Sequence, residues 1–319
     1  MKTPVVPLFA LSCLLGAMVP FRIATAAHDA ASAGTKTLAT ASAADDRDTR
    51  AGAASATMTA SQVVEAHARA WSTRDLPGLL ALFDDDARSY DRSADPHMLS
   101  GKRSNSIGDK RRLEAYFRET YAVQAPSRES IASMAVVGDL VVAAGESAQA
   151  PDFATRMRFL TAFRVRHGRI HDLWHIAWLP VEASSGAGPA EVIRQLIAAR
   201  TAGDAGRFLA LFSPEAKHFC PSADPRKLAD RQCDGSTDAT GREAFMRNHP
   251  GQEPLRIEVV ALFSAGDLVV QQSRVTGLVG RPGEAVDQVS IYRVRDGRIV
   301  DTWLLGEEIP AAAARGDAS

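Results

Sequence analysis

The chain has 319 residues, of which 45% are hydrophobic and 24% are charged, and its formal net charge at pH 7 is −1. This near-neutral balance, together with the absence of any basic block in the sequence, argues against nucleic acid as a partner. The length exceeds what one compact domain usually needs, so more than one domain is expected.

Residues 1–26 have the pattern of an export signal. Lys2 supplies a positive start, Val5 to Val19 form an apolar core, and the small residues that end at Ala26 fit a peptidase site. The core is short for a membrane span and no second apolar segment follows it, which favours a signal peptide over an anchor. We therefore expect a periplasmic or secreted protein with no membrane contact after cleavage.

Residues 27–58 consist mainly of Ala, Ser, Thr and Asp and contain almost no large apolar side chain. Such a segment cannot bury enough surface to offset the entropy of ordering, so it is predicted to be a flexible linker. Residues 183–189 form a second linker, and residues 310–319 form an Ala-rich tail that is expected to be disordered. Two patterned regions remain as predicted domains, at residues 59–182 and 190–309.

The two patterned regions are copies of one another at a constant offset of 129 positions. Three separate matches show this offset: LALF at 80–83 and 209–212, SADP at 93–96 and 222–225, and RVR-x-GRI at 164–170 and 293–299. Trp174 and Trp303 keep the same register. A repeat of this length indicates two whole domains rather than a solenoid of short units.

Each copy is predicted to begin with an amphipathic helix, which starts near Ser61 or Ala190. In the first copy a short helix over 76–83, an extended segment over 89–91 and a third helix over 110–121 follow. The remainder alternates as strands do, with turns at Gly138-Asp139 and His167-Gly168. We therefore predict an α+β fold of two tandem cone-shaped domains, each with three helices packed in a strongly curved, mainly antiparallel sheet whose open end forms a pocket.

The candidate catalytic residues of the first copy have a distinctive spacing. His67 lies on the first helix, Asp75 follows it by eight positions, ALFDDDA occupies 81–87, and Asp91 comes next. In this spacing the copy resembles the ketosteroid-isomerase and SnoaL-like domains of the nuclear transport factor 2-like superfamily. The resemblance implies that Asp91 is the proton-shuttling base and that His67 takes the place of the oxyanion-stabilising residue. The second acid of steroid isomerases would lie near Leu160 or Thr161, where this chain has no acid.

These two assignments also make chemical sense in themselves, because a carboxylate in an apolar pocket is suited to take a proton from carbon. An imidazole that faces it could donate a hydrogen bond to an enolate oxygen. The second copy has Leu196 and Cys220 at the two positions. The structural alternatives are therefore a core histidine for His67 and a turn residue for Asp91.

Further ligand-binding candidates in the first copy are Trp71, Tyr90, His97 and His175. Regular alternation along the last strand predicts that Trp178 lies on the face opposite to His175. Together these residues indicate an exported protein that binds a small apolar molecule, with isomerase- or cyclase-type acid–base chemistry in the first domain as a further option. The alternative is a non-catalytic periplasmic ligand-binding or protein-interaction module.

Cys220 and Cys233 are the cysteines that remain after signal removal, and a disulfide between them is predicted for an oxidising compartment. The alternatives are two free thiols, or a zinc site that includes His218. No metal, nucleotide or phosphate motif is found in the sequence, so no cofactor and no metal are expected. Because related single domains pair through their sheets, the resemblance also implies an intramolecular pseudo-dimer of the two domains.

Overall fold

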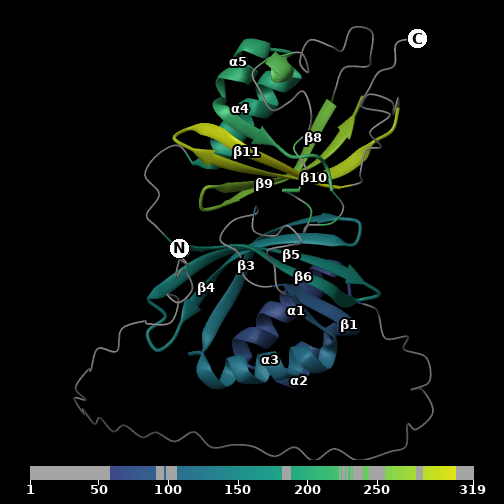
Figure 1. Cartoon of the computed structure of the whole chain (residues 1–319), viewed down its shortest axis with the longest axis vertical. Helices are drawn as coiled ribbons and strands as arrows, with labels where there is room; N and C mark the ends of the chain where they lie inside the picture. Colours follow the sequence, from purple (N-terminus) through teal and green to yellow (C-terminus); the bar gives the residue numbers. More distant parts are fainter. Residues whose placement is uncertain are drawn as a thin grey trace, which may run out of the picture. The chain divides into compact units, whose positions relative to one another are not determined.

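The computed structural model describes residues 58–90, 97, 106–181, 188–222, 224, 227, 229–230, 232, 240–243, 256–277 and 283–306. These residues form two α+β halves (Figure 1). The predicted signal peptide, almost all of the predicted linker at 27–58 and the predicted tail at 310–319 lie outside the described residues. Within the described ranges, no helix is both long enough and apolar enough to cross a bilayer.

The first half contains three helices and one six-stranded sheet. The helices are α1 (Ala60–Thr73), α2 (Leu76–Ala81) and α3 (Lys110–Val123), and they lie along one face of the sheet (Figure 1). The strands are β1 (Phe83–Tyr90), β2 (Ser106–Gly108), β3 (Ser127–Val137), β4 (Leu140–Gln149), β5 (Thr155–Arg166) and β6 (Arg169–Pro180). They follow the order β2-β1-β6-β5-β4-β3, in which only the β1–β6 pair is parallel.

The second half repeats this arrangement with a five-stranded sheet. Its helices are α4 (Pro189–Thr201) and α5 (Ala205–Ala210), and residues 240–243 are also helical. Its strands are β7 (Phe212–His218), β8 (Arg256–Ala265), β9 (Leu268–Thr276), β10 (Val286–Arg295) and β11 (Arg298–Leu305), in the order β7-β11-β10-β9-β8. The β7–β11 pair, which corresponds to β1–β6, is parallel and the others are antiparallel. The predicted α+β class and duplication are confirmed.

Equivalent side chains begin the second helix of each half. The Asp75 side chain accepts a hydrogen bond from the Gly78 N–H at 2.9 Å, and the Asp204 side chain accepts one from the Arg207 N–H at 2.9 Å. Each aspartate therefore satisfies an N–H group that the helix itself leaves without a partner. The Asp75 position in the family-like spacing is thus explained by helix capping and does not require a catalytic role.

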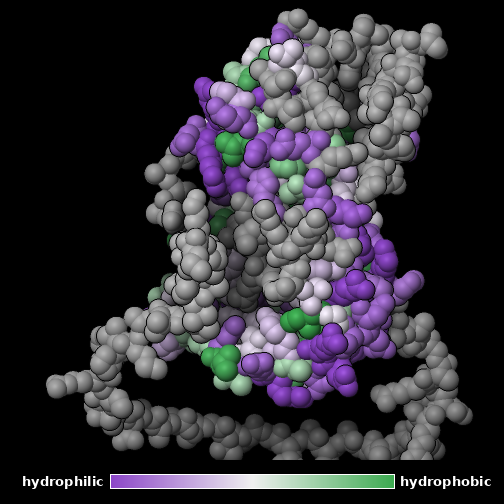
Figure 2. Space-filling model, in the orientation of Figure 1, coloured by the Kyte–Doolittle hydropathy of each residue, from purple (hydrophilic) through white to green (hydrophobic). Residues whose placement is uncertain are grey.

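The buried hydrophobic side chains form three clusters. One cluster lies between the helices and the sheet of the first half and includes Phe83, Phe117 and Phe163. A second, in the second half, includes Leu196 and Tyr292. The third cluster draws on the sheets of both halves, with members such as Tyr90, Trp174, Phe219, Ile291 and Trp303. On the face drawn in Figure 2, most of the described surface is hydrophilic and hydrophobic residues form small separate patches.

Two details differ from the sequence-based expectation. The second helix ends at Ala81, and strand β1 begins already at Phe83, because Phe83 pairs with Ile170 of β6. On β6 the register shifts opposite Leu160 and Thr161, where Thr161 pairs with His175 and Leu160 pairs with Ala177. This extra residue interrupts the alternation and brings Trp178 to the His175 side of the sheet, contrary to the prediction.

Candidate functional site

A pocket in the first half is lined by residues of α1, α3 and four strands of its sheet, β1, β3, β5 and β6. The space between these side chains, counted together with the part that is open to solvent, is about 520 Å³. The lining residues are His67, Ala68, Trp71, Ser89, Tyr116, Phe117, Glu129, Ile131, Phe159, Thr161, Phe163, Leu173, His175 and Trp178. Most of these side chains are aromatic or aliphatic, and a few polar groups are placed among them.

His67 is the most deeply placed polar side chain that α1 contributes to the pocket. It is 6% exposed, and its ring makes edge contacts with Phe83 and Phe163, with ring centroids 5.8 and 5.4 Å away. Burial lowers the pKa of His67 to about 4, so the imidazole is neutral at neutral pH. Its Nε2 atom is buried and has no hydrogen-bond partner among the described residues. A buried nitrogen in this state costs stability unless another group satisfies it.

Tryptophan side chains form two parts of the pocket wall. The Trp71 indole donates a hydrogen bond from Nε1 to Ser127 Oγ at 3.1 Å, which fixes the ring. Trp178 stacks on Phe159, with centroids 5.6 Å apart and planes 16° apart, and it makes an edge contact with His175 at 6.4 Å. These aromatic faces suit an apolar or planar ligand.

The pocket also contains polar residues that sequence reasoning missed. Glu129 of β3 is half-buried, and Ser89 and Thr161 are 5% and 3% exposed. Ser127 and Ile131 lie two positions before and after Glu129 on β3, and both also contact or line the pocket wall. Strand alternation from Ile131 was the signal that could have identified Glu129.

Of the six residues proposed from sequence for the first-half site, the structure brings His67, Trp71 and His175 together in the pocket. Tyr90 does not line it: the ring stacks on Trp174 at 5.5 Å within the cluster that both sheets share, because neighbouring residues of β1 point to opposite faces. His97 does not line it either, since its Nε2 lies 3.4 Å from Asp301 Oδ2. Asp91 lies outside the described residues.

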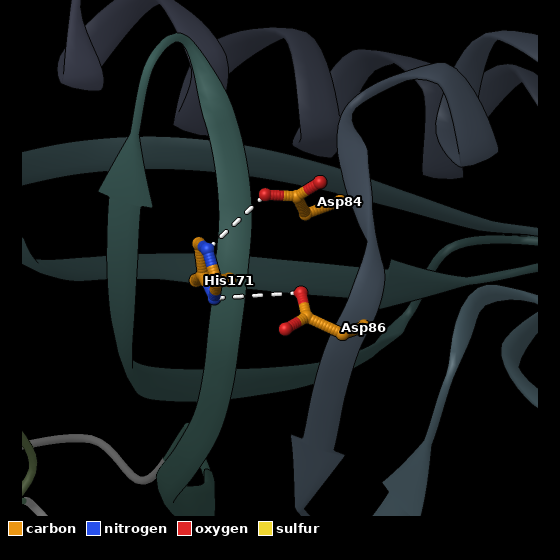
Figure 3. A group of neighbouring side chains, drawn as sticks. All are labelled: Asp84, Asp86 and His171. Atoms are coloured by element: carbon orange, nitrogen blue, oxygen red, sulfur yellow. Dashed lines mark ion pairs between the residues drawn. The ribbon is translucent and has the colours of Figure 1, made fainter.

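A second group of polar side chains lies where β1 and β6 run side by side. Figure 3 shows the His171 ring between two carboxylates: Nε2 lies 3.1 Å from Asp84 Oδ2, and Nδ1 lies 3.8 Å from Asp86 Oδ1. Three such ligand atoms, all within 4.8 Å of one another, could hold a metal ion. However, the two ring nitrogens face different carboxylates and the Asp86 side chain is 79% exposed, which suits ion pairs at the surface better than a shared cation.

The second half has different residues at the positions of the proposed catalytic pair. Leu196 takes the place of His67 on α4 and is 5% exposed, in the apolar cluster of that half. Cys220 takes the place of Asp91 and is 9% exposed. Cys233 lies outside the described residues, so the Cys220–Cys233 disulfide stays a prediction.

Comparison with protein families gives a match in each half. The model of the SnoaL-like domain matches residues 64–173 and again residues 193–302. Among curated proteins, no match is found. The residues described above as the pocket all lie within or immediately beside the first matched range.

Three solved structures that resemble the chain each cover less than half of it. A protein of Catenulispora acidiphila with a ketosteroid isomerase-like fold, solved in complex with trimethylamine, is 18% identical, with 37% of this chain and 85% of that chain covered and a TM-score of 0.30. An epoxide hydrolase of M. tuberculosis is 21% identical, with 36% and 80% covered and a TM-score of 0.29. An NTF2-like protein of unknown function from Cytophaga hutchinsonii is 10% identical, with 37% and 88% covered and a TM-score of 0.28.

Proposed function

Because this chain belongs to the SnoaL-like domain family in both of its halves, we propose that its first half binds a small, largely apolar molecule in the pocket beside His67. Aromatic side chains that include Trp71, Phe159 and Trp178 would contact the apolar part of the ligand. The few polar groups among them would fix its orientation.

The main observation behind the proposal is the environment of the His67 imidazole. Its buried Nε2 has no hydrogen-bond partner among the described residues, and it belongs to a side chain of the pocket wall. A neutral imidazole can donate or accept a single hydrogen bond at this nitrogen, depending on its tautomer. We infer that a carbonyl, ether or hydroxyl oxygen of the ligand supplies the missing partner.

We further propose that the first pocket can carry out acid–base chemistry on the molecule that it binds. Such chemistry requires a carboxylate within reach of the ligand in addition to the His67 imidazole. Asp91 is the candidate from the sequence, and Glu129 is the candidate from the pocket wall. With either acid, the expected reaction class is proton transfer next to a carbonyl or at an epoxide, and without an acid in place the pocket would bind its ligand without turnover.

Three further features of the chain remain proposals that accompany this function. Residues 1–26 would direct export, and Cys220 and Cys233 would form a disulfide in the oxidising compartment. The two halves would act as an intramolecular pseudo-dimer. The hydrophobic cluster that contains side chains of both sheets supports this pairing.

Binding can be tested through the tryptophans of the pocket. Trp71 and Trp178 line it, whereas Trp174 and Trp303 are fully buried in the cluster that both sheets share. Mass spectrometry of the mature protein would first identify any small molecule that co-purifies. Titration of that molecule should change tryptophan fluorescence in the wild type, and Trp178→Leu should remove most of the change. No co-purifying molecule, and no fluorescence response to a panel of cyclic enones and epoxides, would contradict the proposal.

A further inference from the structure

The second half carries polar residues on the surface that corresponds to the wall of the first pocket. The constant offset of 129 relates six pocket residues of the first half to six residues of the second. The pairs are His67 and Leu196, Trp71 and Arg200, Ser89 and His218, Thr161 and Ser290, Phe163 and Tyr292, and Leu173 and Thr302. Trp71, Phe163 and Leu173 thus have an arginine, a tyrosine and a threonine as their counterparts. The Ser89 and Thr161 positions are polar in both halves, and the His67 position is polar only in the first.

Strand register places these residues on one face of the second sheet. Thr302 pairs with His218 of β7 on one side and with Tyr292 of β10 on the other. The same pairs exist in the first half, where Leu173 pairs with Ser89 and Phe163. Cross-strand neighbours lie on the same side of a sheet, so the three residues form one row.

A second row continues this polar face. Ser290 pairs with Gln271 of β9, and Ser273 lies two positions beyond Gln271 on the same strand. The Tyr292 hydroxyl group donates a hydrogen bond to Gln271 Oε1 at 3.2 Å. All of these side chains are less than 10% exposed. The second row is therefore polar and shielded from water, and in the first row Tyr292 and Thr302 are buried while His218 is half-buried.

Two positive charges act on His218 at this face. Among the described residues, the charges that act on His218 are those of Arg200, in the last turn of α4, and Arg242. Arg242 is 5% exposed, and its guanidinium donates from Nη1 to the Ala216 carbonyl at 3.2 Å. Burial and these two arginines lower the pKa of His218 to about 4, so the imidazole is neutral at neutral pH.

Two hydroxyl groups on this face also lack partners. Ser273 Oγ and Thr302 Oγ1 are buried and have no hydrogen-bond partner among the described residues, and their residues are 0% and 4% exposed. Unsatisfied buried hydroxyls are uncommon in folded proteins and call for an explanation. A ligand oxygen on this face would supply the missing acceptor beside the cationic groups.

We propose that the second half binds a small organic carboxylate on the face formed by Arg200, His218 and Thr302. The guanidinium provides the charge-assisted hydrogen bonds that a carboxylate prefers, and the imidazole and hydroxyl groups add further donors. Leu196 and Leu304 are available for the hydrocarbon part of the ligand, since Leu196 belongs to the apolar cluster of this half and Leu304 pairs with Ser290. This site is separate from the first pocket and does not depend on the function proposed for it.

Binding should be measured on the full mature chain with acetate and benzoate as probes, at constant ionic strength adjusted with chloride. Calorimetry on the wild type should give saturable binding of at least one of the two. Arg200→Gln and Thr302→Val should each weaken it roughly tenfold or more. Arg194→Gln is the matched control, because Arg194 is exposed on the same helix and pairs with Glu191.

Thr302→Val also separates binding from folding. The Thr302 hydroxyl is buried and has no partner in the described part of the chain, so its replacement by a methyl group of similar shape should leave the melting temperature of the free protein unchanged or raise it. A variant with retained stability and weakened carboxylate binding supports the site. The proposal is overturned if the wild type binds neither probe at about 10 mM, if both variants bind as the wild type does, or if inorganic phosphate binds more tightly than either carboxylate.

Discussion

The side chain of Gln272 makes two hydrogen bonds with the backbone of Val136. Its Nε2 donates to the Val136 carbonyl at 2.7 Å, and its Oε1 accepts from the Val136 N–H at 3.0 Å. Val136 belongs to β3, the last strand in the order of the first sheet, and Gln272 belongs to β9 of the second half. One amide thus satisfies both polar groups of a residue on an edge strand, as a neighbouring strand would do.

Replacement of this amide should destabilise the protein. Gln272→Leu keeps the approximate volume but leaves both Val136 groups without their partner, which should lower the free energy of unfolding by about 1–2 kcal/mol. Urea unfolding monitored by circular dichroism would measure the change. Gln149→Leu is the control, because Gln149 is exposed at the end of β4 and should change stability little. Equal effects of the two substitutions would contradict the role of Gln272.

The residues His67 and Leu196 allow a reciprocal exchange between the halves. His67→Leu removes a buried nitrogen that has no partner among the described residues, so we expect the stability of the free protein to be unchanged or to rise by up to about 1 kcal/mol. Leu196→His places an imidazole in an apolar cluster and should cost about 2 kcal/mol or more. Thermal unfolding of both variants checks the pair. Strong destabilisation by His67→Leu would mean that the imidazole serves the fold and not a ligand.

Buried histidines should make the protein sensitive to mild acid. The pKa of His67 is lowered to about 4 by burial, whereas an unfolded chain takes up the proton near pH 6.5. The unfolded state therefore binds more protons between these values, and stability should fall as the pH drops from 6.5 towards 4, by on the order of 3 kcal/mol for His67 alone. His218 should add to the same trend. Urea unfolding at pH 7, 5.5 and 4 would show it, and His67→Leu should flatten the dependence.

If the first half catalyses an acid–base reaction, its turnover should depend mainly on one of two carboxylates, Asp91 or Glu129. If Asp91 is the base, Asp91→Asn should reduce turnover of a reactive cyclic enone or epoxide by on the order of a hundredfold. Glu129→Gln would then act mainly on substrate binding. Glu119→Gln, at an exposed position of α3, serves as the control and should retain full activity. A larger loss with Glu129→Gln would transfer the role to the pocket wall, and equal turnover in all variants would favour a pocket without catalysis.

Periodicity in the sequence was sufficient to predict the duplication, the α+β class and the interior position of His67. Helical spacing places Val63, His67 and Ala70 on one side of α1 wherever that helix packs, and all three are buried. Strand alternation likewise separates Ser89, in the pocket, from Tyr90, on the opposite face. These features follow from the repeat of side-chain directions along a helix or a strand, which does not depend on the rest of the fold.

Only the tertiary structure decided which residues share the pocket. The extra residue opposite Leu160 and Thr161 moves Trp178 to the side of His175, and no alternation rule could locate that shift in advance. Strand alternation groups Glu129 with Ile131, but this side of β3 faces the pocket because β3 packs against α1, a long-range contact that the spacing of residues does not encode. The sequence by itself determined two copies of one fold with different residues at equivalent positions. Tertiary packing decided the chemistry of each interior, because burial and neighbouring charges set the protonation state of His67 and of His218.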